Sequence, residues 1–370
     1  MIIDGRNTSG TPETDYDLIV VGGGPAGISL VLELQGLGLR IALLESGGME
    51  FDADTQMLAE GSMEGNSDAF DLAGSRLRML GGTTNHWGGH CTPLDPIDFR
   101  RSPGNGLSGW LFDKEHLDPF YARANVYCDL GAYDYRLDAV SGIGPDDLLL
   151  PDTPAVETVI LRQSEPTRFG RKYADTLERA ENIHVWLWTS ATHLAIGPDG
   201  TITSLETQSL SGTRRDFSAR AVILAGGAIE NARLLLASNA RNETTVGDRG
   251  KLLGACYMDH PSGGAGFLYF DEPVSEKVYW SGIKTHAIGD VPIHFTWRLT
   301  DDYIDRTDLP NSHYYVIPLS SDSDVRRRQR EAKSSVYALK NMAKWALGRD
   351  MPRTFELSEE YCRFITNTDS

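Results

Sequence analysis

Residues 16–45 constrain the fold more than any other part of the sequence. A short apolar run at 17–21, Asp-Leu-Ile-Val-Val, is typical of a buried strand and leads into Gly-Gly-Gly-Pro-Ala-Gly at 22–27, which fits the pattern G-x-G-x-x-G. Apolar residues then recur at helical spacing from Leu30 to Leu37, and a second apolar run at 40–44 ends on Glu45. Strand, glycine turn, helix and strand in this order predict a βαβ unit that binds a dinucleotide.

Each glycine of the pattern has its own physical role. Gly22 allows the tight turn, Gly24 lets the backbone approach a pyrophosphate, and Gly27 permits close contact between helix and strand. The pattern alone also occurs in ordinary strand–turn–helix units, and it does not separate FAD from NAD. The cofactor is therefore left open at this point.

The first turn of the expected helix completes the phosphate site. Pro25 suits this position because its missing N–H would have no partner there, and Ala26 follows it. The unpaired N–H groups and the positive end of the helix dipole would face the phosphates. Glu45, at the end of the second strand, is predicted to accept hydrogen bonds from a ribose diol.

The net charge argues against two classes of partner. The chain has 370 residues, enough for two domains or one large one, and 35 Lys and Arg against 52 Asp and Glu give a formal net charge of −17. That balance argues against nucleic acid and against an anionic membrane surface. The sequence leaves the oligomeric state open, including a homo-oligomer.

The sequence shows no targeting, membrane or metal signal. Residues 1–15 have no apolar signal-peptide core, and no apolar run approaches the ~20 residues that a membrane helix needs, so we expect a cytoplasmic protein. The four cysteines form no C-x-x-C pair, so neither a zinc site nor a dithiol centre is expected.

A second glycine-rich segment covers residues 76–93. It runs Arg-Leu-Arg-Met-Leu-Gly-Gly-Thr-Thr-Asn-His-Trp-Gly-Gly-His-Cys-Thr-Pro. Glycines let backbone lie against a flat ligand, while Thr, Asn and His offer hydrogen-bonding groups at its polar edge. Composition alone fits an ordered, turn-rich loop equally well.

The middle of the chain has the pattern of a mixed sheet. Strands over 183–188, 191–196, 201–209 and 214–218 alternate in polarity and predict an antiparallel meander. Residues 221–238 then repeat the opening pattern, with a buried parallel strand, a glycine turn and a helix. Further helices are expected over 116–130, 171–180 and 334–346, strands of a second sheet over 278–315, and a solvated basic cluster at 326–330.

Three stretches taken together resemble the glucose–methanol–choline (GMC) family of FAD-dependent oxidoreductases. They are residues 16–45, residues 80–87 (Leu-Gly-Gly-Thr-Thr-Asn-His-Trp) and residues 224–236. The tetrapeptide Met-Asp-His-Pro at 258–261 and the tripeptide Ser-Gly-Trp at 108–110 also resemble bacterial members. The resemblance implies FAD rather than NAD and argues against a NAD-dependent dehydrogenase.

The resemblance also implies a set of FAD-binding residues. The glycines of 22–27 would lie at the pyrophosphate and Glu45 at the adenosine ribose, while the loop 81–89 would lie against the isoalloxazine ring. Ala191 would contact the adenine, and the turn 225–227 would pack near the pyrophosphate. The full expected set is Gly22, Gly24, Pro25, Ala26, Gly27, Glu45, Arg76, Gly81, Gly82, Thr83, Asn85, His86, Gly88, Ala191, Ala225 and Gly226.

His86 raises the question of a covalent flavin. In the pyranose-oxidase branch of the family, a histidine directly before a tryptophan in this loop is the covalent attachment point. His86 and Trp87 match that pair, but the residues after Trp87 differ. A covalent link through His86 therefore stays open beside a non-covalent contact by Asn85 and His86, which we favour.

The family's catalytic segment is missing from this sequence. Family members carry an active-site histidine and a second histidine or asparagine in a C-terminal segment rich in glycine and threonine. The late histidines His286, His294 and His313 lack that context, so no catalytic residue is assigned and the base is expected beyond Ser370. Without a positioned base, ~10²–10⁴-fold of rate is lost.

The expected fold is α/β. A Rossmann-like FAD-binding domain with a parallel sheet and a β-meander would comprise residues 16–95 and 156–258. A partial α+β substrate domain on an antiparallel sheet would comprise 96–155 and 259–370. The expected function is an FAD-dependent oxidoreductase that oxidises CH–OH groups of an alcohol or sugar by hydride transfer to flavin N5, with an unknown electron acceptor, in an incomplete chain. The alternative is a flavin-binding relative without alcohol-oxidising activity.

Overall fold

The computed structural model describes residues 1–7, 13–62, 71–100, 109–243, 245–248, 250–255, 257–258, 278–279 and 287–316. Several expected features lie outside these residues. They are Ser108 of the Ser-Gly-Trp tripeptide, residues 259–261 of the Met-Asp-His-Pro motif, His286, the basic cluster at 326–330 and the helix over 334–346.

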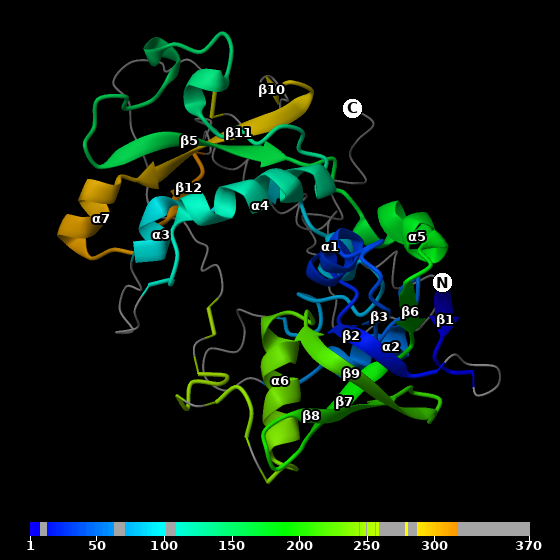
Figure 1. The fold of residues 1–370 in the computed structure, drawn as a ribbon. Coiled ribbons are helices and arrows are strands. Elements are labelled where there is room, and N and C mark those ends of the chain that lie inside the picture. The colour runs from blue at the N-terminus through cyan, green and yellow to red at the C-terminus, as the bar shows by residue number, and fades with distance from the viewer. Residues whose placement is uncertain are drawn as a thin grey trace, which may run out of the picture.

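A seven-stranded sheet organises the first part of the molecule (Figure 1). Its strands, in spatial order, are β1 (Ile2–Asp4), β6 (Ile183–Leu187), β3 (Ile41–Leu44), β2 (Asp15–Val21), β9 (Arg214–Leu224), β8 (Ile202–Gln208) and β7 (Ser190–Ile196). The first five pair in parallel, and β9, β8 and β7 pair antiparallel. The predicted α/β fold with a parallel sheet and a β-meander is confirmed.

Two strand assignments of the meander are corrected. The residues expected as separate strands at 214–218 and 221–225 form the single strand β9, whose first half pairs with β8 and whose second half pairs with β2. Residues 183–187, expected in the meander, instead pair in parallel with β3 and β1. They follow a helix that returns the chain to the start of the sheet, which is the connection a parallel strand requires.

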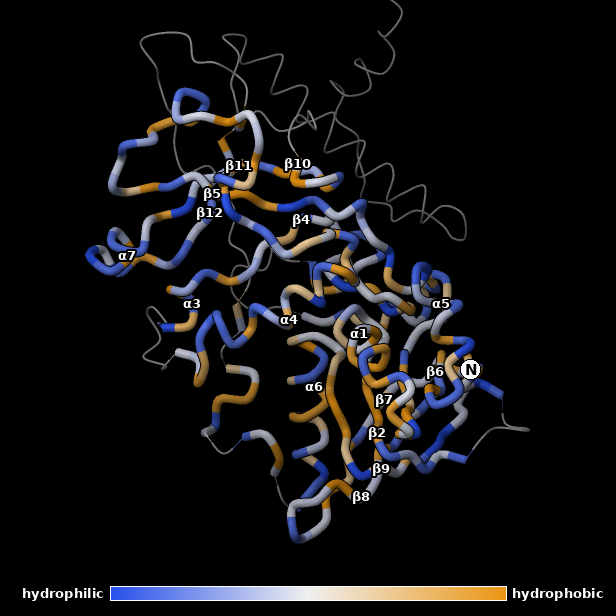
Figure 2. The backbone as a smooth tube through the Cα atoms, turned by 45° about the horizontal axis from the view of Figure 1, so that its top comes forward, coloured by the Kyte–Doolittle hydropathy of each residue, from blue (hydrophilic) through white to orange (hydrophobic). Residues whose placement is uncertain are grey.

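Helices cover one face of the parallel strands, and the meander covers the other. Helices α1 (Pro25–Glu33) and α5 (Phe169–Arg179) pack on the first face through Ile28, Val31, Phe169 and Leu177, all buried. The second face buries its apolar side chains against the meander, in a cluster of Ile19, Ala42, Leu44, Trp186, Leu194, Leu205 and Phe217. Figure 2 shows the hydrophobic colouring of β2 and β9.

The strand at 221–224 is parallel, as predicted, but it is not fully buried. Ile223 is 38% exposed. Helix α6 (Ala228–Asn239) follows this strand and packs on β7, where Ser238 Oγ accepts a hydrogen bond from Leu194 N at 3.0 Å. Because α6 lies over β7, it leaves part of β9 uncovered.

Helix α1 is shorter than its apolar spacing predicts. The helix ends at Glu33, and Leu37 is 64% exposed. Gly36 and Gly38 adopt φ of 79° and 74°, which is left-handed backbone that interrupts a right-handed helix. The apolar spacing therefore continues past the end of the helix.

A second, five-stranded sheet lies at the other end of the molecule (Figure 1). It contains β10 (Ala287–Ile288), β11 (Val291–Leu299), β5 (Val156–Gln163) and β4 (His90–Cys91) in that order, and β12 (His313–Tyr314) pairs with β11. All pairs are antiparallel, so the predicted second sheet is confirmed. Within the range expected as strand, residues 301–307 form helix α7 (Asp301–Thr307) instead, because Thr300 caps a helix there.

Three further α-helices lie in the segments between the strands of the two sheets. They are α2 (Ala53–Gln56), α3 (Pro96–Arg100) and α4 (Lys114–Tyr127). Helix α4 corresponds to the helix expected over 116–130. Its Asp113 cap accepts a hydrogen bond from His116 N at 3.0 Å.

The division into two domains stays a proposal, and the strand pairing suggests a different boundary near residue 156. Strand β5 falls in the range assigned to the FAD-binding domain, but its backbone pairs with β11 in the second sheet. We therefore propose that the return into the FAD-binding domain lies after Gln163 rather than at residue 156.

Candidate cofactor site

Three glycine-containing segments meet at the carboxyl ends of the parallel strands. The turn 22–24 joins β2 to α1, the turn 225–227 joins β9 to α6, and the loop 80–88 lies against the first turn. In α/β sheets this edge is where ligands bind, because helix N-termini and strand ends leave backbone donors there.

The first turn fits the geometry expected of a phosphate-binding glycine turn. Gly22 has φ of 116°, and an added Cβ would lie 2.5 Å from Ala225 O. An added Cβ on Gly27 would lie 2.0 Å from Gly22 O, so only glycine lets α1 start this close to β2. At Gly24, in contrast, an added Cβ would meet no atom of the described residues within 4 Å. The space beside Gly24 is therefore open to a ligand.

The start of α1 supplies unpaired backbone donors toward this space. Gly24 is the N-cap, Pro25 occupies the first turn, and Ala26 is exposed. No side chain caps this helix end. The first N–H groups of a helix have no acceptor within the helix, so they can bind an anion here.

Glu45 is held by the protein itself. Its side chain is 5% exposed; Oε2 accepts a hydrogen bond from Gly23 N at 2.9 Å, and Oε1 accepts one from Gly47 N at 2.8 Å. Ser46 Oγ donates to Oε1 as well, at 3.2 Å. The carboxylate ties the glycine turn to the end of β3, a role that the expectation of a ribose contact did not include. A carboxylate has about four acceptor positions, so a ribose hydroxyl can still be accommodated.

The second glycine segment packs directly on the first. Gly81 N donates to Gly23 O at 2.7 Å, and an added Cβ on Gly82 would lie 3.0 Å from Gly24 Cα. Gly81 and Gly82 have φ of 93° and 52°. The backbones of the two segments are therefore in direct contact beside Gly24.

The loop is braced by the side chains on its inner side. Buried Thr84 donates its hydroxyl to Gly81 O at 2.6 Å, and Asn85 Nδ2 donates to Leu80 O at 3.0 Å and to Gly82 O at 2.9 Å. Arg168 Nη1 donates to Thr84 O at 2.6 Å and to Trp87 O at 3.2 Å. The amide nitrogen of Asn85 is thus used within the loop.

Other predicted residues of the loop lie toward solvent. Thr83 and Gly88 are exposed, and His86 is half-buried. An added Cβ on Gly88 would meet nothing within 4 Å. Thr83 and Gly88 are therefore the exposed members of the predicted loop residues.

The third turn lies beside the first, and its backbone N–H groups are bound by the protein itself. Ala225 N donates to Val21 O at 2.7 Å, and Gly226 N donates to Asn231 Oδ1 at 2.9 Å. Gly226 is exposed, whereas Ala225 is half-buried. The structure brings both beside Gly22, but it commits their N–H groups to protein acceptors.

Arg76 does not stand free for a cofactor. Its guanidinium donates to Glu230 Oε1 at 2.6 Å, to Ala59 O at 2.6 Å and to Leu72 O at 2.9 Å. Arg78 lies 2.7 Å from Glu230 Oε2, and Arg233 donates to the same oxygen at 2.8 Å. One carboxylate in the first turn of α6 therefore gathers three arginines beside the glycine turns.

The arginines set the charge state of Glu230. Burial would raise the pKa of this carboxyl, but Arg78 and Arg233 outweigh that effect and hold the pKa below its ordinary value. Because three cations meet one anion, this corner carries net positive charge next to the expected pyrophosphate position.

Ala191 lies apart from these turns in β7, where it pairs with Thr207 at a bulge and packs against the second core cluster. Sequence reasoning assigned no role at this site to Arg78, Arg168 or Glu230. Arg168 and Thr84 are 84 residues apart, and no local spacing connects them. Only the pairing of α5 with the loop brings them together.

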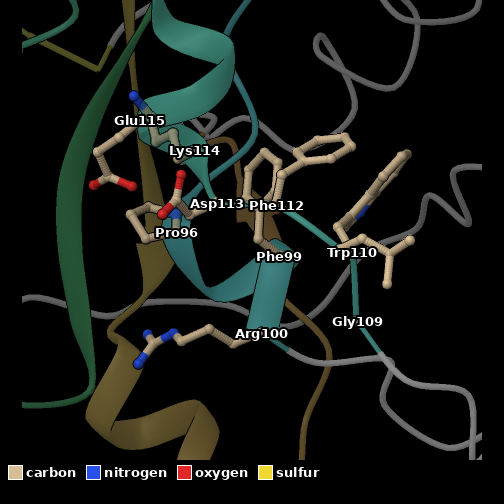
Figure 3. A pocket seen from close by; sticks show the side chains of 10 residues that line it. Pro96, Phe99, Arg100, Gly109, Trp110, Phe112, Asp113, Lys114 and Glu115 are labelled. Atoms are coloured by element: carbon tan, nitrogen blue, oxygen red, sulfur yellow. The ribbon is translucent and has the colours of Figure 1, made fainter.

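A surface pocket lies away from the glycine turns (Figure 3). Figure 3 shows the rings of Phe99, Trp110 and Phe112 gathered on one side of it. Gly109 and Trp110, which belong to the resemblance to bacterial members, pack on α3, where Trp110 N donates to Phe99 O at 3.0 Å. None of the lining residues is among the expected cofactor-binding residues.

The sequence is similar to that of a dehydrogenase. No family model matches the chain. The chain is 24% identical over 280 residues to a 2-methyl-1,2-propanediol dehydrogenase from Mycolicibacterium austroafricanum, a match that covers 68% of this chain and 47% of that protein. The chain therefore spans about half the length of this relative.

Solved oxidases are similar to the chain in structure. A pyridoxine 4-oxidase from Mesorbium loti has a TM-score of 0.39 and 17% identity, over 60% of this chain and 52% of that one. A formate oxidase from Aspergillus oryzae RIB40, studied for modification of its FAD, has a TM-score of 0.36 and 15% identity, over 62% and 48%. Both TM-scores are below 0.5. The predicted resemblance to oxidoreductases is confirmed by the sequence similarity to this dehydrogenase.

Proposed function

We propose that this chain is the cofactor-binding part of an FAD-dependent oxidoreductase that acts on CH–OH groups of an alcohol or a sugar. The observation that carries the proposal is the direct contact between the glycine turn 22–24 and the loop 80–88, beside the open position at Gly24. The sequence similarity to a diol dehydrogenase supports the oxidation of an alcohol.

The residues fit a dinucleotide of this kind. The start of α1 would bind the pyrophosphate with the N–H groups of its first turn, and Arg78 and Arg233 would add positive charge beside it. Glu45 would accept a ribose hydroxyl while it fixes the turn through Gly23. Ala191 is proposed to contact the adenine through its backbone.

The loop 80–88 would bind the flavin ring. Thr83 and Gly88 are exposed on this loop, and Thr84, Asn85 and Arg168 hold its backbone in place. When bound, FAD would accept a hydride from the carbon that bears the hydroxyl. A non-covalent contact by Asn85 and His86 is proposed, with a covalent link through His86 as the alternative outcome.

The partners of the protein are also part of this proposal. A small alcohol or sugar would be the substrate, the electron acceptor is left open, and the net charge of −17 disfavours nucleic acid. Among the helices that the structure describes, none has the length and apolar character needed to cross a membrane. A cytoplasmic location stays a prediction of the sequence, and the oligomeric state, including a homo-oligomer, stays open.

The test is anaerobic reduction of the flavin. Purified protein loaded with FAD is mixed without oxygen with a panel of alcohols, diols and monosaccharides, and the flavin absorbance is followed. Loss of the oxidised flavin bands with at least one compound supports the proposal. Because no catalytic base is assigned in this chain, the reduction is followed over hours rather than seconds. Bound flavin that no compound reduces in that time, while dithionite does, would instead identify a flavin-binding protein without alcohol oxidation.

A further inference from the structure

One face of the second sheet carries a polar cluster next to the loop 80–88. Strand β4 begins at His90, directly after the loop, and His90 pairs with Gln163 on β5. His294 on β11 pairs with Leu161, two residues before Gln163. Side chains two apart on a strand share a face, so His90, Gln163 and His294 lie on the same side of the sheet.

The opposite face of these strands is the apolar core. Ile160, Ile293 and Phe295 alternate with the polar residues and are all buried in one cluster. The strand register that buries these apolar side chains in the core therefore also places the polar side chains together on the other face.

Gln163 links this face to the loop 80–88, the flavin loop. Its Nε2 donates to Gly88 O at 2.6 Å, and its Oε1 lies 2.7 Å from His294 Nε2. A backbone carbonyl only accepts hydrogen bonds, so the amide nitrogen must face Gly88 and the amide oxygen must face His294. The amide oxygen in turn only accepts, so His294 Nε2 must carry the hydrogen.

This arrangement fixes the tautomer of His294. With the hydrogen on Nε2, a neutral ring has its lone pair on Nδ1. Burial, with the nearby His90 as a second cause, lowers the pKa of His294 below its ordinary value, so the ring is neutral at neutral pH. The ring of His90 lies 4.6 Å from that of His294, and His90 is exposed.

We propose that His90, Gln163 and His294 form a hydroxyl-binding site for the substrate beside the flavin loop, in which Nδ1 of His294 accepts a hydrogen bond from a substrate hydroxyl. The site rests on the proposed function for its substrate class, an alcohol or a polyol. Gln163 is a positioning residue that acts through His294, and the exposed His90 forms the rim of the site.

The tautomer is tested first, independently of turnover. Nuclear magnetic resonance of FAD-loaded protein with ¹⁵N-labelled histidine should show His294 with a hydrogen on Nε2 and none on Nδ1. The Gln163→Glu variant should convert His294 to the doubly protonated ring, because a carboxylate partner favours the cation. A hydrogen on Nδ1 in the wild-type protein would overturn the site.

Ligand binding is tested on the same signals. The flavin is first reduced with dithionite, so that an added alcohol is not consumed, and the alcohol that reduced the oxidised flavin in the panel is then titrated in. The Nδ1 signal of His294 should shift on binding. If that alcohol reduces the oxidised flavin but leaves both histidine signals unchanged, the site is overturned and the proposed function stands. If no alcohol reduces the flavin, the proposed function fails and this substrate assignment fails with it.

Variants separate the site from general structure. His294→Phe keeps a ring but removes Nδ1, so it should raise KM for the alcohol about tenfold with FAD affinity retained. Gln163→Leu removes both hydrogen bonds, so it should raise KM as well, and FAD affinity can fall in this variant because the bond to Gly88 O of the loop is lost. His116→Gln, which removes an exposed imidazole on α4, is the matched control and should leave KM unchanged. An unchanged KM in His294→Phe would contradict the proposal.

Discussion

Glu45 Oε2 accepts a hydrogen bond from Gly23 N at 2.9 Å, which joins the end of β3 to the glycine turn after β2. The same carboxylate accepts from Gly47 N through its other oxygen. A buried acceptor that serves two backbone donors fixes the relative position of two neighbouring strand ends. The acidic residue after the second strand is thus part of the turn's own structure.

Replacing Glu45 with Gln should destabilise the fold. A Gln side chain presents an NH₂ group to one of the two backbone N–H donors, so one buried donor loses its acceptor. We expect a loss of about 2 kcal/mol in the free energy of unfolding, measured by urea denaturation. Glu181→Gln, at an exposed position, is the control. Equal midpoints for the wild-type protein and Glu45→Gln would contradict this role.

Two glycines of the first turn should respond differently to alanine. Gly24→Ala adds a methyl group to open space, so stability should be retained while FAD affinity falls about tenfold or more. Gly27→Ala places a Cβ 2.0 Å from Gly22 O, so the helix must move and stability should fall as well. Denaturation together with FAD titration separates the two effects. Full FAD affinity in Gly24→Ala would place the pyrophosphate elsewhere.

Glu230 should make stability dependent on pH. Its folded-state pKa lies below the ordinary 4.5, so its stabilisation is present above pH 4.5 and is lost as the pH falls through the folded pKa. Glu230→Gln should cost about 2 kcal/mol at neutral pH, and its difference from the wild-type protein should shrink below pH 4.5. Asp175→Asn breaks the exposed pair with Arg179 and should change little. A difference that is independent of pH would contradict the assignment.

Arg168 should matter for the flavin although no local pattern marks it. Arg168→Leu removes the donors to Thr84 O and Trp87 O, so the loop loses its brace and FAD affinity should fall about tenfold. The neighbouring Arg171 is exposed, and Arg171→Leu is the matched control. Equal FAD affinities in the two variants would show that the loop holds its shape without Arg168.

Local patterns predicted the elements well and the tertiary partners poorly. The glycine turn, the helix after it and the meander follow from spacing, because turn chemistry and alternation are local properties. That β9 belongs to both halves of the sheet depends on pairing with β2 and β8, which are distant in sequence. The helix at 25–33 ended early because Gly36 and Gly38 act on the backbone, while apolar spacing counts only side chains.

At the candidate site, too, local patterns predicted the segments but not their tertiary partners. The three glycine segments could be named from the sequence, but the partners that brace them could not. Arg76 was expected at the cofactor, and the structure pairs it with Glu230, which is 154 residues away. The link from Gly88 through Gln163 to His294 joins one loop and two strands, β5 and β11, whose sequences carry no shared motif.

Equilibrium binding of FAD tests the central claim most directly. The purified protein is titrated with FAD and, separately, with NAD, and bound cofactor is followed by the change in flavin absorbance and by calorimetry. The account predicts saturable binding of FAD, weak or absent binding of NAD, and a loss of FAD affinity in Gly24→Ala without loss of stability. Binding of NAD in preference to FAD, or FAD binding that Gly24→Ala leaves unchanged, would contradict it.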